Sequence, residues 1–129
     1  MSCLFDSLSH FVQNINASEL RKMIVDYLAK DPLIFDDLKE KGRLSELLQF
    51  ENNQSVSLSQ YIHHMTNPNA WGGAIEIRAF CEMFKARVMI KVYSDGKFIE
   101  FIPDTCAPTA TFNLGYTGNH YEPISVKLE

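Results

Sequence analysis

Apolar residues recur every three or four positions in four stretches of the chain's first two thirds. A repeat close to 3.6 residues predicts amphipathic helices that bury one face. The four stretches are residues 4–12, 20–28, 58–65 and 74–84. Asn16 and Glu19 have the spacing of a capping box, so we expect the second helix to begin directly after Asn16.

A weaker helical pattern covers residues 35–49, where Gly42 interrupts it. Glycine lowers helix stability, and the polar run 51–55 that follows is typical of a loop. The predicted helix 74–84 carries Cys81 in its apolar stripe. We therefore expect Cys81 to be a buried packing residue.

After residue 85 the apolar repeat changes to two, which predicts strands. Asp95-Gly96 is a two-residue hairpin signal, so we expect the first two strands to be antiparallel. A turn at Thr117-Gly118-Asn119 precedes the last strand. The expected strands are residues 88–93, 98–102, 112–116 and 120–128. Helices first and strands last indicate an α+β domain whose small, mostly antiparallel sheet carries helices packed against it.

Length, charge and cysteine content narrow the function classes. The 129 residues suit a single domain spanning 1–129. The formal charge is −4 and the 12 basic residues are scattered, so we expect no nucleic-acid partner. No apolar run approaches the roughly 20 residues of a membrane span, and polar residues interrupt positions 6–10, so we expect neither a membrane partner nor a signal peptide. Three widely spaced cysteines suit a reducing compartment, and we expect a cytoplasmic monomer.

Metal-ligand spacing is missing from the sequence. His63 and His64 are adjacent rather than one helical turn apart, and no Cys-x-x-Cys pair accompanies the histidines. We therefore expect no metal and no other cofactor.

A cysteine and a histidine far apart in the sequence could form a thiol-protease site. Cys3 stands at the start of the first predicted helix, whose unpaired N–H groups would stabilise a thiolate. Such a site also needs a base that later protonates the leaving amine, and a third group that orients the base. His120 begins a predicted strand, and Glu122 lies on the same face two residues later. The spacing permits this site but does not single it out.

Several sequence blocks make the hypothesis specific. They are Cys3-Leu4-Phe5-x-x-Leu8, Leu20-Arg21 leading to Tyr27-Leu28, Tyr61-x-x-x-Met65 followed by Trp71-Gly72-Gly73-x-x-Glu76-Ile77-x-Ala79, and Asn119-His120-Tyr121-Glu122-Pro123. In this order they resemble the OTU family of cysteine proteases: its nucleophile segment, its next helix, its middle block with a Trp-Gly-Gly turn and its terminal histidine block. The resemblance spans nearly the whole chain.

The resemblance implies a deubiquitinase, a thiol-dependent hydrolase of the ubiquitin conjugation pathway. Cys3 would be the nucleophile, His120 the general base and acid, and Glu122 the orienting group. Asp or Asn is commoner at the last position in this family. Because glutamate has one more methylene, Asn119 and Asn113 stay open as alternative orienting residues.

The implied substrate is ubiquitin or a ubiquitin-like protein, cut after its C-terminal glycine. Its tail would lie in a narrow channel, since residues without a Cβ let the backbone approach the nucleophile closely. The channel would run between the Trp71-Gly72-Gly73 turn and the turn before His120. The implied substrate-binding residues are Trp71, Gly72, Gly73, Asn119 and Tyr121, although packing alone would also explain Trp71 and Tyr121. The compact size would suit a viral or bacterial effector acting in a host cytoplasm.

The chain departs from the family pattern just before the nucleophile. The family usually carries an Asp-Gly segment there, whose backbone amides help to form the oxyanion hole, and here Met1 and Ser2 stand in that place. Losing one oxyanion donor typically costs about a hundredfold or more in rate. Three explanations stay open: a minimal and slow site, a start set too late by gene prediction, or an OTU-like module that recognises ubiquitin without cutting it. An unrelated interaction domain, with all three cysteines in its core, is a further alternative.

Overall fold

The computed structural model describes residues 3–12, 14–35, 41–44, 57–70, 72–103, 106–118 and 120–124. Its helices are α1 (Cys3–Ser9), α2 (Ala17–Leu28), α4 (Leu58–Met65) and α5 (Ala74–Phe84). They match the four predicted helices, although α1 ends before Phe11 and Val12. The capping box at Asn16 is confirmed, because its Oδ1 accepts from the Glu19 N–H at 2.8 Å and its N–H donates to Glu19 Oε1 at 3.2 Å.

The main sheet has the strand order β4-β3-β5-β6. Its strands are β3 (Ala86–Val92), β4 (Phe98–Phe101), β5 (Ala110–Tyr116) and β6 (Tyr121–Pro123). The outer pairings, β3 with β4 and β5 with β6, are antiparallel, while β3 and β5 in the centre are parallel. The predicted strands are therefore confirmed within the described residues, and the predicted 125–128 part of the last strand lies outside them.

The connection between β3 and β4 is wider than predicted. Instead of a two-residue turn at Asp95-Gly96, a four-residue loop is closed where the Val92 N–H donates to the Lys97 carbonyl at 2.8 Å. The Asp95 side chain accepts the Lys97 N–H at 2.9 Å. Gly96 has a φ of +71°, which explains why glycine occupies this loop position.

The predicted helical pattern over residues 35–49 is wrong for its described part. Strands β1 (Leu33–Phe35) and β2 (Lys41–Arg43) form a small antiparallel hairpin, in which Gly42 pairs with Ile34. Short apolar runs do not distinguish helix from strand, because only a few residues carry the repeat. Leu44 follows the hairpin in the core, and its N–H donates to the Pro32 carbonyl at 3.0 Å. Residues 45–49 and the predicted loop 51–55 lie outside the described part.

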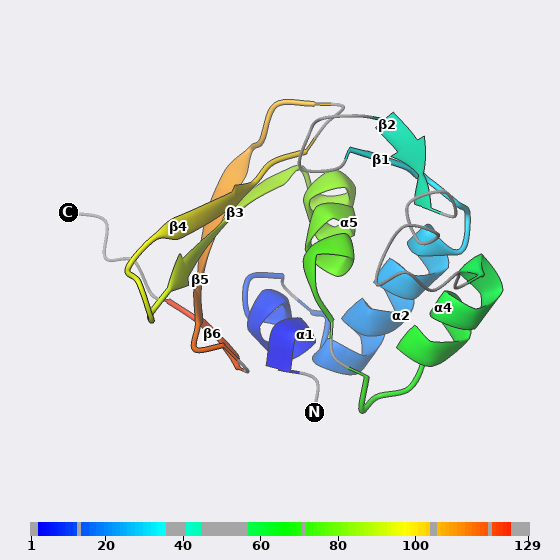
Figure 1. Cartoon of the computed structure of the whole chain (residues 1–129), viewed down its shortest axis with the longest axis horizontal. Helices are drawn as coiled ribbons and strands as arrows, with labels where there is room; N and C mark the ends of the chain where they lie inside the picture. Colours follow the sequence, from blue (N-terminus) through cyan, green and yellow to red (C-terminus); the bar gives the residue numbers. More distant parts are fainter. Residues whose placement is uncertain are drawn as a thin grey trace.

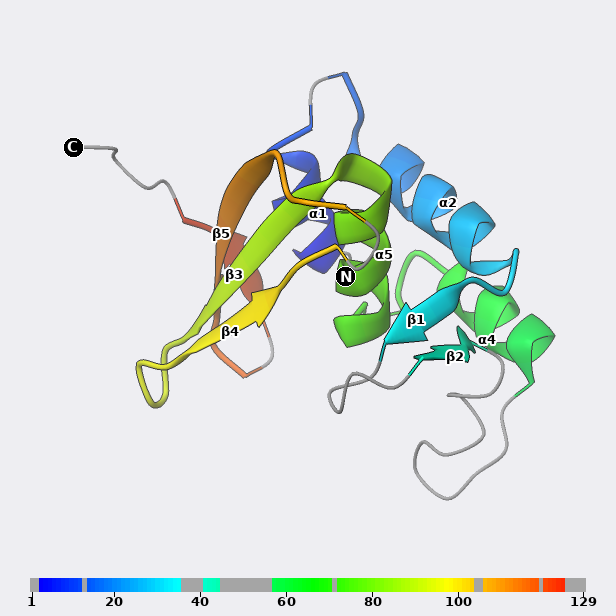
Figure 2. The same ribbon diagram turned by 90° about the horizontal axis from the view of Figure 1, so that it is seen from above.

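The core lies between the main sheet and the helices. Figures 1 and 2 show α5 between this sheet and the pair α2 and α4, with α1 beside β6. Cys81 is fully buried, so its predicted packing role is confirmed. The largest fully buried apolar side chains are those of Leu4, Phe5, Leu8, Leu20, Ile24, Leu28, Leu44, Met65, Ile77, Phe80 and Leu114. Within the described residues, no helix has the length and apolarity to cross a membrane.

Candidate active site

The first helix begins at Cys3, as the sequence predicts. Leu4, Phe5 and Leu8 are buried, so the hydrophobic effect anchors α1 in the core. The Cys3 side chain lies outside the described part. The structure places Cys3 as the first residue of α1.

The histidine block lies next to this helix. α1 packs against β6, which begins one residue after His120 (Figure 1). The turn before β6 is closed by the Thr117 N–H, which donates to the His120 carbonyl at 3.0 Å. Gly118 has a φ of +107°, which L-amino acids other than glycine rarely adopt. The fold thus brings the two predicted catalytic segments together from opposite ends of the sequence, with the His120 side chain exposed.

Glu122 makes its described contact with a residue that the sequence analysis did not single out. Its Oε1 accepts a hydrogen bond of 2.6 Å from the Tyr93 hydroxyl. Among the described residues no hydrogen bond joins Glu122 to His120, so the orienting role of Glu122 stays a prediction. Asn113 lies in β5, and Asn119 lies outside the described part; both remain alternatives.

Tyr121 packs on the face of the sheet opposite to Glu122. Its ring lies 4.6 Å from the ring of Tyr116 at an interplanar angle of 34°. Tyr116 in turn donates from its hydroxyl to the Gly118 carbonyl at 2.6 Å. The tyrosine pair therefore supports the turn that precedes His120, which favours a packing role for Tyr121; substrate contact stays a prediction.

Gly72 lies against the first turn of α1. A Cβ built at Gly72 would be 2.7 Å from Leu4 Cδ2, closer than real Cβ contacts allow, and 3.1 Å from Phe5 Cε2, a tight contact. A Cβ at Gly73 would have no atom within 4 Å. Gly72 is thus required for a close approach to the helix of Cys3, whereas Gly73 has open space around it. Trp71 lies outside the described residues.

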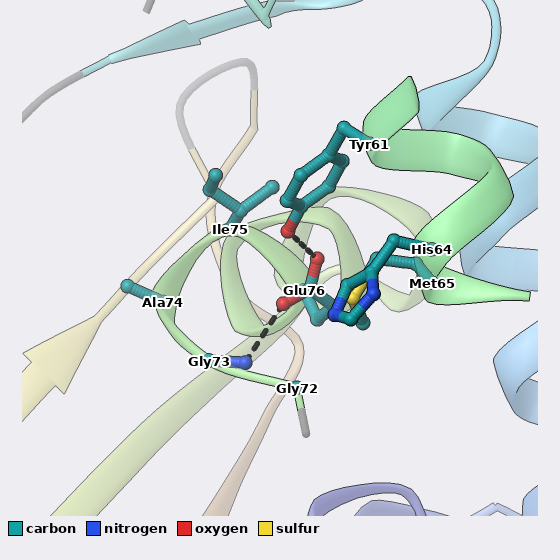
Figure 3. A pocket seen from close by; sticks show the side chains of 8 residues that line it. All are labelled: Tyr61, His64, Met65, Gly72, Gly73, Ala74, Ile75 and Glu76. Atoms are coloured by element: carbon teal, nitrogen blue, oxygen red, sulfur yellow. Dashed lines mark hydrogen bonds between the residues drawn. The ribbon is translucent and has the colours of Figure 1, made fainter. Parts of the chain in front are cut away.

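A buried carboxylate holds this turn from the other side. Glu76 is 2% exposed; its Oε1 accepts from the Gly73 N–H at 2.7 Å and its Oε2 accepts from the Tyr61 hydroxyl (Figure 3). Burial raises the pKa of Glu76 above its ordinary value, and the two hydrogen bonds and the charge of Arg21 oppose this rise only in part. These contacts tie the start of α5 to α4.

Arg21 of α2 holds the segment before the turn. It is 5% exposed, and its guanidinium donates to the carbonyls of Met65 at 2.8 Å and Ala70 at 2.6 Å. The same group lies 4.2 Å from the centre of the Phe5 ring. Burial lowers the pKa of Arg21, while the charge of Glu76 opposes that shift. Arg21 therefore connects α2, α1 and the segment that leads to Trp71.

Sequence reasoning missed the roles of Arg21 and Glu76, although both lie in the quoted blocks. A usable signal was present in their spacing. Arg21 precedes the buried Ile24 and Val25 by three and four positions, and Glu76 precedes the buried Ala79 and Phe80 by the same intervals. Charged residues at core spacing indicate buried polar contacts, since unpaired buried charges are costly.

A cavity of about 260 Å³ opens beside the turn. Its lining residues are Tyr61, His64, Met65, Gly72, Gly73, Ala74, Ile75 and Glu76 (Figure 3). Within the described part of the chain no group of three His, Cys, Asp or Glu residues could hold a metal ion.

Known proteins share the sequence pattern. A family model described as OTU-like cysteine protease matches residues 2–121. The chain is 29% identical to ubiquitin thioesterase otu2 of Schizosaccharomyces pombe, over 95% of the chain and 42% of that protein. It is 27% identical to human ubiquitin thioesterase OTU1, over 95% of the chain and 32% of that protein. The chain thus spans less than half the length of these curated relatives.

Solved structures share the fold. An ovarian tumour (OTU) domain in complex with ubiquitin matches with a TM-score of 0.70 at 18% identity, over 95% of this chain and 62% of that one. An OTU deubiquitinase from Wolbachia pipientis wMel bound to ubiquitin matches with a TM-score of 0.63 at 17% identity, over 96% and 89%. At such identities the likeness shows the fold, and the predicted α+β OTU fold is confirmed.

Proposed function

The chain belongs to the OTU-like cysteine protease family, and on this premise we propose that it is a deubiquitinase. It hydrolyses the bond after the C-terminal glycine of ubiquitin or a ubiquitin-like protein, with Cys3 as the nucleophile. We also propose that residues 1–129 act as one domain, as a monomer in the cytoplasm, because the widely spaced cysteines suit a reducing compartment.

One observation carries this proposal: α1, which begins at Cys3, packs both against β6 and against Gly72. A protease site needs the nucleophile beside its base and beside a surface that positions the substrate backbone. The histidine turn lies at the start of β6, and the glycine turn contacts the residues directly after Cys3. The arrangement supports a tail channel between these two turns.

The reaction takes two steps at this site. The Cys3 thiolate attacks the carbonyl carbon of the terminal glycine, the carbon–nitrogen bond breaks, and His120 gives its proton to the leaving amine. A thioester of Cys3 remains. Water then attacks the thioester while His120 accepts its proton, and the glycine carboxylate leaves as the Cys3 thiolate forms again. Glu122 orients the imidazole during both proton transfers.

A ubiquitin probe tests this proposal. Its C-terminal glycine carries a thiol-reactive group, and we expect it to label the unmodified chain and the Cys106→Ala variant but not Cys3→Ala. Cys106 is partly exposed, so it is a matched control for a reactive thiol. Label lost on Cys106→Ala in a folded protein would contradict the nucleophile assignment. Binding without labelling would favour the OTU-like module that recognises ubiquitin without cutting it. Absence of both binding and labelling would refute the ubiquitin function.

A further inference from the structure

Three strands contribute neighbouring positions on the sheet face that carries Glu122. In the register of the sheet, Glu122 of β6 pairs with Gly115 of β5, and Gly115 pairs with Lys91 of β3. Tyr93 lies two residues after Lys91, so it is on the same face. The Tyr93 N–H donates to the Tyr116 carbonyl at 3.1 Å, which holds the backbone of Tyr93 against β5. Tyr93 and Glu122 are therefore separated by the width of one strand.

The Tyr93 side chain crosses that strand directly over Gly115. A Cβ built at Gly115 would lie 2.1 Å from the phenol oxygen and 2.5 Å from the ring carbon that bears it. Any residue other than glycine would close this path. The hydroxyl then reaches Glu122 Oε1 at 2.6 Å, a short distance typical of a hydrogen bond to a carboxylate.

The hydrogen bond from Tyr93 restrains the Glu122 carboxylate and occupies only one of its acceptor positions. Glu122 is exposed, and a free glutamate side chain samples many rotamers. A carboxylate offers about four acceptor positions, so the bond from Tyr93 leaves the second oxygen available. The bond also raises the pKa of the Tyr93 hydroxyl above its ordinary value.

We propose that Tyr93 is a positioning residue for the reaction: it holds Glu122 across Gly115 so that the free carboxylate oxygen can accept the ring N–H of His120. This inference rests on the proposed deubiquitinase function. Gly115 is then required for the same contact, because the absence of a Cβ leaves room for the Tyr93 ring above β5. Tyr93 itself touches neither the substrate nor the reacting atoms.

Tyr93→Phe removes the hydroxyl and keeps the ring. With a fluorogenic ubiquitin substrate we expect kcat to fall about fivefold to tenfold, the scale of one typical hydrogen bond, while KM and the melting temperature stay unchanged. In a Glu122→Ala background the same change should have no further effect. An unchanged kcat for Tyr93→Phe, or an equal loss in both backgrounds, would overturn the positioning role.

Gly115→Ala tests the path without altering either partner. The added Cβ collides with the end of the Tyr93 side chain, which is 42% exposed, so we expect Tyr93 to turn outward into solvent while the fold persists. We expect a kinetic loss equal to that of Tyr93→Phe, and no further loss when Gly115→Ala is added to a Tyr93→Ala variant, which already lacks the hydroxyl. A loss that persists in the Tyr93→Ala background would refute the proposed path. If the unmodified chain neither labels nor cleaves, the proposed function fails as well; if it cleaves and Tyr93→Phe is silent, only the positioning role fails.

Discussion

Gly72→Ala is the sharpest test of the contact between the glycine turn and α1, the helix that begins at the proposed nucleophile Cys3. The new Cβ would lie 2.7 Å from Leu4 Cδ2 and 3.1 and 3.2 Å from two ring carbons of Phe5. Leu4 and Phe5 are 1% and 0% exposed, so neither side chain can move into solvent. Leu4 must then repack within the core, or the glycine turn and the first turn of α1, which Cys3 begins, must move apart.

Overpacking of this kind costs about 1–3 kcal/mol of unfolding free energy. For a domain of this size each kcal/mol lowers the melting temperature by about 3–5 °C, so we expect a decrease of about 3–15 °C. The protein would stay mostly folded at 25 °C. A shift of the nucleophile by about 1 Å can still cost around a hundredfold in rate. The labelling rate should therefore fall by a much larger factor than the fraction of folded protein does.

The assay combines thermal unfolding by circular dichroism with the rate of labelling by the ubiquitin probe. Gly73→Ala is the matched control, because its Cβ meets no atom within 4 Å; its stability should change by less than about 1 kcal/mol, the scale of a helix-cap change. Leu4→Val removes the Cδ2 atom, so the stability loss of Gly72→Ala should shrink in that background. A Gly72→Ala protein with the original melting temperature and labelling rate would refute the proposed contact.

Further predictions concern the base, its orienting group and the buried carboxylate. His120→Ala should lower the rate by about a thousandfold or more, as loss of a cooperating catalytic group does, whereas His64→Ala on α4 should label normally; the reverse result would exclude His120. Glu122→Gln should lose less kcat than Glu122→Ala, because the amide oxygen still accepts a hydrogen bond; three equal values would assign orientation to another residue. Burial raises the folded-state pKa of Glu76 above 4.5, so the stability tied to its neutral form is present below that pH and is lost as pH rises through the folded-state pKa. Urea unfolding from about pH 4 to 8 should show Glu76→Gln gaining stability relative to the unmodified protein with rising pH, and a constant difference would contradict the raised pKa.

Local sequence was sufficient for the elements whose repeat is long and whose ends carry capping residues. The helices α2, α4 and α5 and the strands β3 and β5 follow from apolar spacing, because each buries one face over several turns or alternations. The helical start at Cys3 follows from the same repeat. The short β1 and β2 hairpin does not, since three residues in each strand are too few to show a period.

The contacts that assemble the candidate site depend on residues far apart in the sequence. The parallel pairing of β3 with β5 determines that Tyr93 can reach Glu122 across Gly115, and no local pattern specifies which strands become neighbours. The burial of Arg21 and Glu76 likewise depends on how α2, α4 and α5 pack around the glycine turn. Sequence by itself determined which residues could carry the chemistry. Tertiary structure decided which of them meet, because strand pairing and helix packing join segments whose separation along the chain leaves no periodic signal.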